Sequence, residues 1–297
     1  MLPTVALIEY CISLLSSFST IFLLYCIFRF KSPLALWKDS SPLALLLVSI
    51  GTFTIFSTLE CIQWILLLLG IYPNIPENAP SIMTLGLLYY GFHVFYIVAT
   101  LGVFVQRIYF FLCPTKPLDR LNKVIVYVVI TVTVASVANC TLANVVDVST
   151  DPLAPVPEGC FSLNCSRVLA RRSYNIVTIS VLSIVSVILG TILQLVFIQF
   201  KSQYQSANTK IINKFVKYSF YIRLVCETIP FLVDTVLVLT MNVKIGIYVG
   251  PYGAFGSSLD LVTVTFLYYA LFVKKKRTHS EKAESTSKVS VITRTKQ

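Results

Sequence analysis

The chain has 297 residues, of which 56% are apolar and 12% are charged, and its mean hydropathy is +0.79. Too few polar side chains are available to cover a soluble globule of this size, so the composition excludes that class and indicates an integral membrane protein. The net charge of +11 does not favour nucleic-acid binding, because the basic residues lie between apolar stretches and not in one domain. Their distribution favours anionic membrane lipid as the partner.

Seven apolar stretches are each long enough to cross a bilayer as a helix, which needs about 20 residues. Stretches such as residues 65–69 are apolar on every side, which excludes the alternating pattern of a membrane β-barrel. We therefore expect an all-α bundle of seven transmembrane helices within residues 1–273. The predicted spans are residues 5–28, 43–69, 81–112, 124–146, 174–200, 218–241 and 251–273.

Lysine and arginine are unequally divided between the two sides of such a bundle. Of the 24 basic residues, 19 fall in residues 29–40, 107–123, 201–217 and the tail, whereas 4 fall on the opposite side. The positive-inside rule then places the amino terminus outside and the carboxy terminus in the cytoplasm. We expect the first span to be retained, because Arg29 and Lys31 follow it where a signal peptide would have a small-residue cleavage site.

The third span ends in a polar pair, Arg107 and Tyr109. An arginine this close to hydrocarbon costs a few kcal/mol on insertion scales, so a function is the default hypothesis for it. The alternative is that the side chain reaches the lipid headgroups and fixes the depth of the helix. The residues alone leave both interpretations open.

The longest outer connection, residues 147–171, contains Cys160 and Cys165. Both would face an oxidising compartment, where they could bridge to each other or to another outer cysteine. Asn164 begins an N-glycosylation sequon on the same side, so we expect a possible glycan there.

The sixth span carries Arg223, Glu227 and Asp234, which lie within about 40° of one line on a straight helix. We expect one polar stripe that faces the bundle. Pro230 predicts a kink about which the span could pivot. A simple ion pair between Arg223 and Glu227, one turn apart, is the alternative to a signalling role.

His93 in span three, Asp234 in span six and Asp260 in span seven are the candidates for a ligand cavity. Ionisable side chains inside a membrane mark functional sites by default, although the two aspartates could equally bind a cation or water between helices. The tail, residues 274–297, begins with a basic cluster and continues with eight Ser and Thr residues. We expect it to be disordered and open to phosphorylation, or else merely solvated.

The sequence gives little support to the hypothesis that the protein is an enzyme. The chain has two histidines, His93 and His279, so a multi-histidine zinc hydrolase lacks ligands, and neither a nucleophile elbow nor a phosphate-binding loop is present. We expect no enzyme activity, no metal and no cofactor. A secondary transporter would use buried acids of this kind, but no second half repeats the first. A ligand-gated ion channel of seven helices also fits the span count.

Seven spans with an outer amino terminus, together with Gln106-Arg107-Ile108-Tyr109 and Pro114, resemble the G-protein-coupled receptors, in which an Asp/Glu-Arg-Tyr motif closes helix three. Over residues 5–273 the chain resembles the nematode serpentine chemoreceptors, most closely class BC, through residues 158–165 and 250–253. The resemblance implies a chemosensory receptor in the plasma membrane, in the sensory cilium of a chemosensory neuron.

Such a receptor would bind a small environmental molecule and activate a heterotrimeric G protein, with an arrestin-like protein as a further partner at the tail. The coupling residues implied are Arg107, Tyr109, Arg223, Glu227 and Pro230.

The sequence departs from the rhodopsin-like pattern in several places. Gln106 stands where an acid would hold the arginine at rest, and no cysteine lies at the outer end of span three to bridge to the outer loop. No tryptophan precedes Pro230, and span seven lacks the Asn-Pro-x-x-Tyr motif. These departures favour a divergent switch within the same topology.

Overall fold

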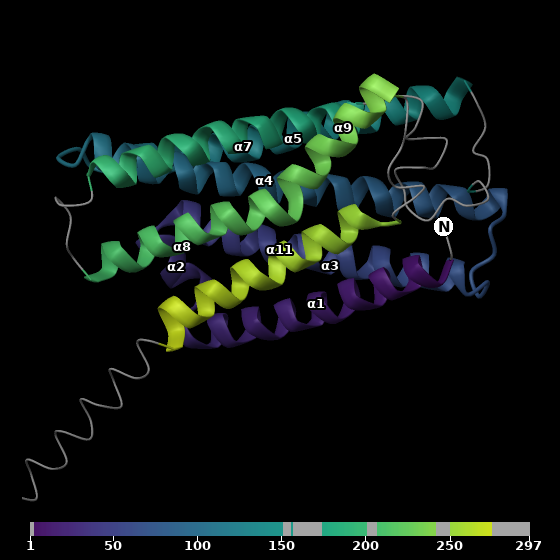
Figure 1. Ribbon diagram of the computed structural model, residues 1–297, viewed down its shortest axis with the longest axis horizontal. Helices are drawn as coiled ribbons and strands as arrows, with labels where there is room; N and C mark the ends of the chain where they lie inside the picture. The colour runs from purple at the N-terminus through teal and green to yellow at the C-terminus, as the bar shows by residue number, and fades with distance from the viewer. Residues whose placement is uncertain (1–2, 151–155, 157–173, 201–206, 242–249, 275–297) are drawn as a thin grey trace, which may run out of the picture.

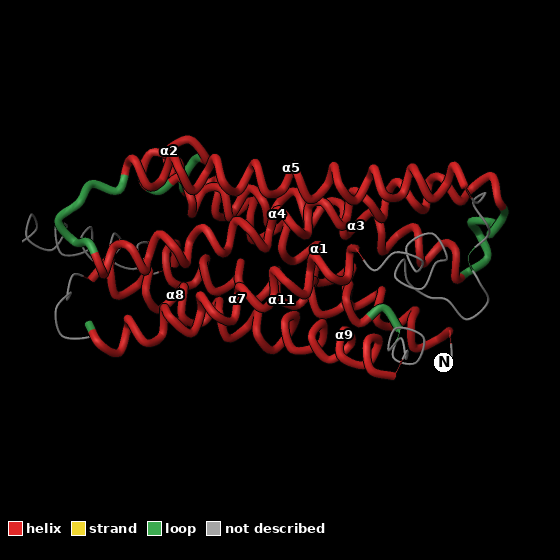
Figure 2. Tube along the Cα trace, turned by 90° about the horizontal axis from the view of Figure 1, so that it is seen from above, coloured by secondary structure: helices red, strands yellow, loops and turns green. Residues whose placement is uncertain are grey.

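A computed structural model describes residues 3–150, 156, 174–200, 207–241 and 250–274. Within those ranges every regular element is helical, and the long helices lie roughly parallel to one axis (Figure 1). A view turned by 90° shows the same bundle from above (Figure 2). Cys160, Cys165 and Asn164 lie outside the described residues, as does the tail beyond Lys274.

The helices of the first half are α1 (Pro3–Phe30), α2 (Pro33–Asp39), α3 (Ser41–Leu68), a short 3₁₀ turn η1 (Pro76–Asn78), α4 (Ala79–Leu112) and α5 (Asp119–Thr150). Those of the second half are α7 (Tyr174–Gln199), α8 (Ala207–Arg223), η3 (Leu224–Thr228), α9 (Ile229–Met241), α11 (Tyr252–Tyr268) and η4 (Tyr269–Lys274). Both η3 and η4 are π-helical.

The predicted all-α class is confirmed for the described residues, and six of their helices are long and apolar enough to cross a membrane, as expected of a membrane-embedded protein. They correspond to six of the seven predicted spans. The predicted sixth span, residues 218–241, is not among them, because η3 divides it between α8 with 17 residues and α9 with 13. Residues 207–241 are nevertheless helical throughout.

Two local differences from the predicted boundaries have physical causes. The connection after the first span contains α2, which begins with Pro33 at its first turn and is capped by Ser32, whose Oγ accepts a hydrogen bond from the amide of Ala35 at 3.3 Å. The predicted sixth span begins eleven residues too late, since α8 starts at Ala207. Its first turns are amphipathic, so a purely apolar criterion misses them.

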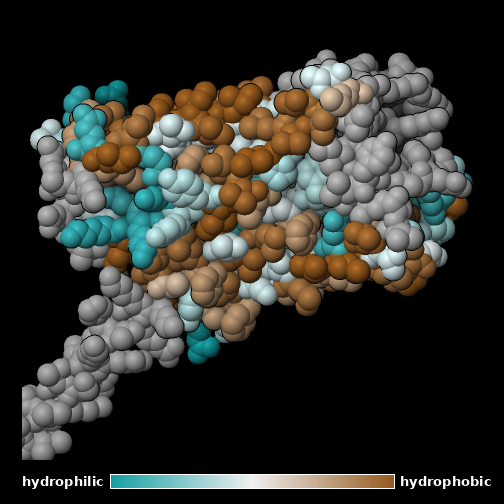
Figure 3. Space-filling view, viewed as in Figure 1, coloured by the Kyte–Doolittle hydropathy of each residue, from teal (hydrophilic) through white to brown (hydrophobic). Residues whose placement is uncertain are grey.

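The central helix of the bundle is α4, which contacts α3, α5, α7 and α8. In the most apolar 18-residue stretch of α4, 72% of the residues are buried by protein. In the corresponding stretch of α5, 17% are buried. The outward faces of the other helices carry exposed apolar side chains, for example Leu15, Phe22 and Leu195. Brown apolar surface accordingly covers much of the length of the bundle, and teal polar side chains gather near the end where α8 begins (Figure 3).

The π-turn η3 ends at Thr228, two residues before Pro230. Its i→i+5 pattern is seen in the amide of Ile229, which donates to the carbonyl of Leu224. Pro230 has no amide hydrogen, so the carbonyl of Cys226 loses the donor that a regular α-helix would provide. A Cβ at Gly256 of α11 would lie 2.2 Å from that carbonyl oxygen, so only glycine lets α11 pack this closely against η3.

Replacing Gly256 by alanine should therefore destabilise the bundle. The methyl group would collide with backbone, which cannot rotate away, and overpacking of this kind costs about 1–3 kcal/mol. Thermal unfolding of the purified protein should show a lower midpoint for Gly256→Ala. The matched control is Gly253→Ala, whose added Cβ meets the movable ring of Phe231 at 3.3 Å. An equal loss in both variants would contradict the role assigned to Gly256.

Candidate functional site

Five polar side chains meet in the interior of the bundle, and we call them the buried polar cluster: His93 and Tyr96 on α4, Arg223 at the end of α8, Glu227 in η3 and Asp260 on α11. Each side chain is at most 2% exposed. Ionisable groups are seldom buried to this extent unless they pair with one another, so the contacts between them decide how the cluster is held.

Glu227 is the carboxylate that joins α4 to the helical run 207–241. Its Oε1 contacts Nε2 of His93, and its Oε2 lies 3.1 Å from Nη2 of Arg223. Because the two oxygens point to different partners, the carboxylate connects a side chain on α4 with one on α8. The ion pair between Arg223 and Glu227, considered above as the alternative to a signalling role, is thus present in the structure. His93 is a second partner of the same carboxylate.

Tyr96 extends the cluster from Arg223 to α11. The guanidinium carbon of Arg223 lies 4.5 Å from the centroid of the Tyr96 ring, which is a favourable cation–π geometry. The hydroxyl of the same tyrosine donates a hydrogen bond of 2.7 Å to Oδ2 of Asp260. Helices α4, α8 and α11 are therefore connected through one chain of polar contacts.

Aromatic rings enclose the imidazole of His93. Phe53 of α3 stacks on it at 4.9 Å with an interplanar angle of 9°, and Phe231 of α9 lies at 5.8 Å. Tyr89, one turn earlier on α4, lies at 6.1 Å. These rings fix the orientation of the imidazole and exclude water, which strengthens its interaction with Glu227.

The charges of the cluster do not cancel by themselves. Arg223 is the one permanent cation, whereas Glu227 and Asp260 are both acids, so the cluster carries a net negative charge unless a proton resides on His93 or Asp260. Oδ1 of Asp260 and Nη1 of Arg223 have no hydrogen-bond partner. The arrangement can therefore hold a proton and can exist in more than one hydrogen-bonded state.

Asp234 lies apart from this cluster, although a straight helix would align it with Arg223 and Glu227. Asp234 is seven residues beyond Glu227, about 10 Å along a helix, so the predicted single stripe comprises two sites. Asp234 accepts a hydrogen bond of 2.5 Å from the hydroxyl of Tyr252 at the start of α11, and the ring of Tyr252 lies 5.9 Å from that of Phe231. Both acids of the stripe are nevertheless buried, as expected.

Arg107 lies near the other end of α4 and is 8% exposed. Its guanidinium carbon is 5.8 Å from the ring centroid of Phe110, and its Nε has no hydrogen-bond partner. The side chain is covered by protein, so the interpretation that it extends to the lipid headgroups is not supported. Tyr109, the other predicted coupling residue of this helix, is half-buried.

Gln106, the residue before Arg107, connects three segments of the chain by hydrogen bonds. The side-chain amide of Gln106 donates to Oδ1 of Asn122 at 2.7 Å and to Oγ of Ser40 at 3.2 Å. These bonds connect α4 with α5 and with the junction of α2 and α3. The glutamine that stands in place of an acid thus holds neighbouring helices and makes no ion pair with the arginine.

The structure brings together four of the predicted site residues and separates the rest. His93, Arg223, Glu227 and Asp260 meet, whereas Asp234 and Arg107 lie elsewhere. Reasoning from the sequence missed Tyr96, Phe53 and Tyr252, which are uncharged and do not stand out among apolar residues. Tyr96 carried one usable signal, because a residue three positions after His93 shares its helical face.

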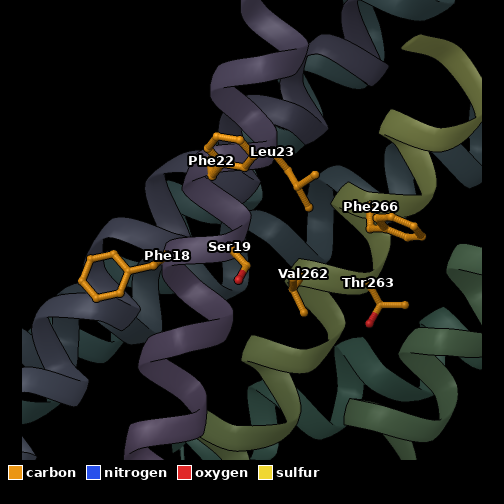
Figure 4. A pocket seen from close by; sticks show the side chains of 7 residues that line it. All are labelled: Phe18, Ser19, Phe22, Leu23, Val262, Thr263 and Phe266. Atoms are coloured by element: carbon orange, nitrogen blue, oxygen red, sulfur yellow. The ribbon is translucent and has the colours of Figure 1, made fainter. Parts of the chain in front are cut away.

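Two apolar grooves of about 630 Å³ each lie outside the cluster. One is between α1 and α11, where Ser19 and Thr263 are its hydroxyl-bearing residues (Figure 4). Both hydroxyls donate to backbone carbonyls of their own helices, at 2.9 Å and 2.7 Å. The other groove lies between α4 and α5 and is lined mainly by apolar side chains. In the second groove the buried Oγ1 of Thr133 has no hydrogen-bond partner, whereas the predominantly apolar linings of both grooves suit the acyl chains of lipid.

In the described part of the chain, no three His, Cys, Asp or Glu side chains are placed to hold a metal ion. No protein-family model matches the sequence, and no curated protein matches it. The function is therefore inferred from the geometry of the site.

A double-mutant cycle should reveal the strength of the pair between Arg223 and Glu227. Either Arg223→Met or Glu227→Gln should lower the free energy of unfolding by about 3–5 kcal/mol, because each leaves its partner charged and buried. The double variant should lose less than the sum of the two. Chemical unfolding in detergent micelles measures all three. Lys214→Met, at an exposed position of α8, should change stability by less than about 0.5 kcal/mol, and additive losses would contradict the pairing.

Proposed function

We propose that this protein is a seven-helix chemosensory receptor of the plasma membrane, which detects a small molecule from outside and activates a heterotrimeric G protein. The observation that carries the proposal is the buried link between His93 on α4 and Glu227 in the π-turn, next to Pro230. A paired charge at a deformable point of a helix provides two alternative arrangements that a ligand can shift.

In the resting state, the contact between Glu227 and His93 holds residues 207–241 against α4. A ligand that favours a different hydrogen-bonded state of the cluster releases this contact. The segment α8 then pivots about η3 and Pro230, and its cytoplasmic end moves away from α4. Buried polar networks suit such a switch, because their hydrogen bonds can be exchanged between alternative partners.

The proposed output is at the end of α4 that carries Arg107. Its guanidinium is buried beside Phe110 and has an unpaired Nε, so movement of α8 would offer a preformed cationic donor to an acidic or carbonyl group of the G protein. Tyr109 lies at the same end of the helix. Gln106 keeps α4, α5 and the α2–α3 junction together, which leaves α8 as the element free to move.

The proposed topology has residues 207–241 as the sixth of seven crossings. It is supported by the positions of the ends: the amino terminus of α1 and the end of α11 lie at opposite ends of the bundle (Figure 1). An odd number of crossings is required for that arrangement in a bilayer. Exposed Lys210, Lys214 and Lys217 lie on one face of α8 and suit the cytoplasmic headgroups.

Epitope tags at the two ends test this topology. In intact cells an antibody should bind the amino-terminal tag and should reach the carboxy-terminal tag only after the plasma membrane is permeabilised. A protein of known orientation, tagged in the same way, serves as the control. If the two tags become accessible together, the crossings are even in number and the receptor topology is wrong.

Removing the link between α4 and Glu227 should raise signalling without any ligand. We expect His93→Phe, which keeps the stacking on Phe53 but cannot bind the carboxylate, to shift the equilibrium by about 1–2 kcal/mol toward the released state. Basal nucleotide exchange by purified heterotrimeric G proteins, measured with the receptor in nanodiscs, should rise several-fold. Adding Arg107→Ala to His93→Phe should abolish the increase.

The control is Thr84→Val, which alters an exposed hydroxyl nine residues earlier on α4 and should leave exchange unchanged. If His93→Phe activates none of a panel covering the G-protein classes, the receptor function fails. The same preparation can then be placed in a planar bilayer or in liposomes. Conductance or accumulation of substrate without G protein would identify a channel or a secondary transporter.

A further inference from the structure

A second group of acids lies near the end of the bundle where α1 begins, and Tyr89, which is within electrostatic range of both Glu60 and Glu227, lies between it and the buried polar cluster. Glu60 of α3 is 5% exposed and lies about two turns before the end of that helix. Glu9 lies about two turns after the start of α1. Both carboxyl groups are close enough to the phenol of Tyr10 to interact with it electrostatically, so the two acids lie on the same side of the bundle.

Within the part of the chain that the structure describes, neither acid pairs with a cation. Oε2 of Glu60 and Oε2 of Glu9 are buried and make no hydrogen bond, and no lysine, arginine or histidine among the described residues pairs with either. A buried carboxylate that has the Trp64 side chain as its hydrogen-bond partner but no cation remains expensive, because its charge has lost most of its hydration. The position is therefore suited to a cation that comes from outside the chain.

The surroundings of Glu60 are aromatic. Trp64, one turn along α3, reaches its carboxyl group, and the ring of Trp64 stacks on that of Tyr10 at 6.3 Å with an interplanar angle of 3°. Tyr89 of α4 lies within electrostatic range of the same carboxylate. Aromatic faces attract organic cations, most strongly when water is excluded. A hydrated metal ion would instead need several oxygen ligands in a fixed geometry.

We propose that Glu60, with Tyr10 and Trp64, forms a recognition site for a small organic ammonium ion that carries an apolar group. The ammonium would bind the carboxylate of Glu60, and its apolar part would pack against the two rings. This inference deepens the proposed function by naming a ligand class for a receptor, but the binding it describes requires no G protein.

The chain contains two tryptophans, Trp37 and Trp64, which allows a direct test. Trp37 is on α2, and the Trp37→Phe variant leaves Trp64 as the single fluorophore within the proposed site. The probe is the 2-phenylethylammonium ion, added to the full-length protein in nanodiscs at pH 7. We expect a saturable change in Trp64 emission. The neutral analogue 2-phenylethanol should produce no saturable change, which separates recognition of the ammonium from partition into lipid.

In the same single-tryptophan background, Glu60→Gln should weaken binding of the probe at least about tenfold, because a charge-assisted contact is lost. The matched control is Glu77→Gln, the same change at an exposed position of η1, and it should bind as before. If Glu60→Gln unfolds, the site is still tested by comparing the Trp64 emission change with 2-phenylethylammonium and with 2-phenylethanol. Equal responses to both, no saturable response, or unaltered binding in a folded Glu60→Gln variant would each overturn the site. Binding of the probe without nucleotide exchange would instead reject the receptor function and retain the site.

Discussion

The constraint on which this bundle depends is a permanent charge in its interior. Arg223 is 2% exposed, so it needs a carboxylate, and Glu227 provides one at 3.1 Å from the next turn. A pair of this kind is weak as a source of stability, because the loss of hydration offsets most of the attraction. Its consequence is specificity, because few arrangements of neighbouring side chains can contact both charged groups. From α4, the ring of Tyr96 contacts Arg223 and His93 contacts Glu227. The hydroxyl of Tyr96 in turn donates a hydrogen bond to Asp260.

The backbone around the pair is adapted to it. Pro230 removes an amide, the preceding turn widens to a π-helix, and Gly256 allows α11 to approach the carbonyl of Cys226. Asp234 is seven residues beyond Glu227, about 10 Å along a helix, and it accepts a hydrogen bond from Tyr252. The cluster therefore contains one cation and two acids, and Asp234 has a separate partner.

The sequence predicted what depends on hydropathy and on spacing within one helix. Length and apolarity identified the helices, and the i,i+4 spacing identified the pair of Arg223 and Glu227. The other contacts join residues 134 and 164 positions apart, namely His93 with Glu227 and Tyr96 with Asp260. Such contacts depend on how each helix is rotated about its axis, which a single sequence does not specify. The π-turn was missed for a related reason, because proline predicts a kink but not the way in which neighbouring carbonyls are accommodated. Helix α2 was missed because a seven-residue helix depends on its cap more than on periodicity.

The same geometry indicates which helix must move if the protein signals. His93 and Arg107 are fourteen residues apart on α4, or about 21 Å along its axis, and α4 is enclosed by α3, α5, α7 and α8. A continuous helix packed on most of its sides cannot bend to carry a change over that distance, because close-packed cores resist continuous deformation. The helical run 207–241 differs, since it contains a π-turn and a proline and exposes one face of α8. A change at Glu227 is therefore transmitted more easily by a displacement of α8 past a fixed α4. Arg107 would then be uncovered without moving, so the buried cluster and the arginine can be coupled without a rearrangement of the core.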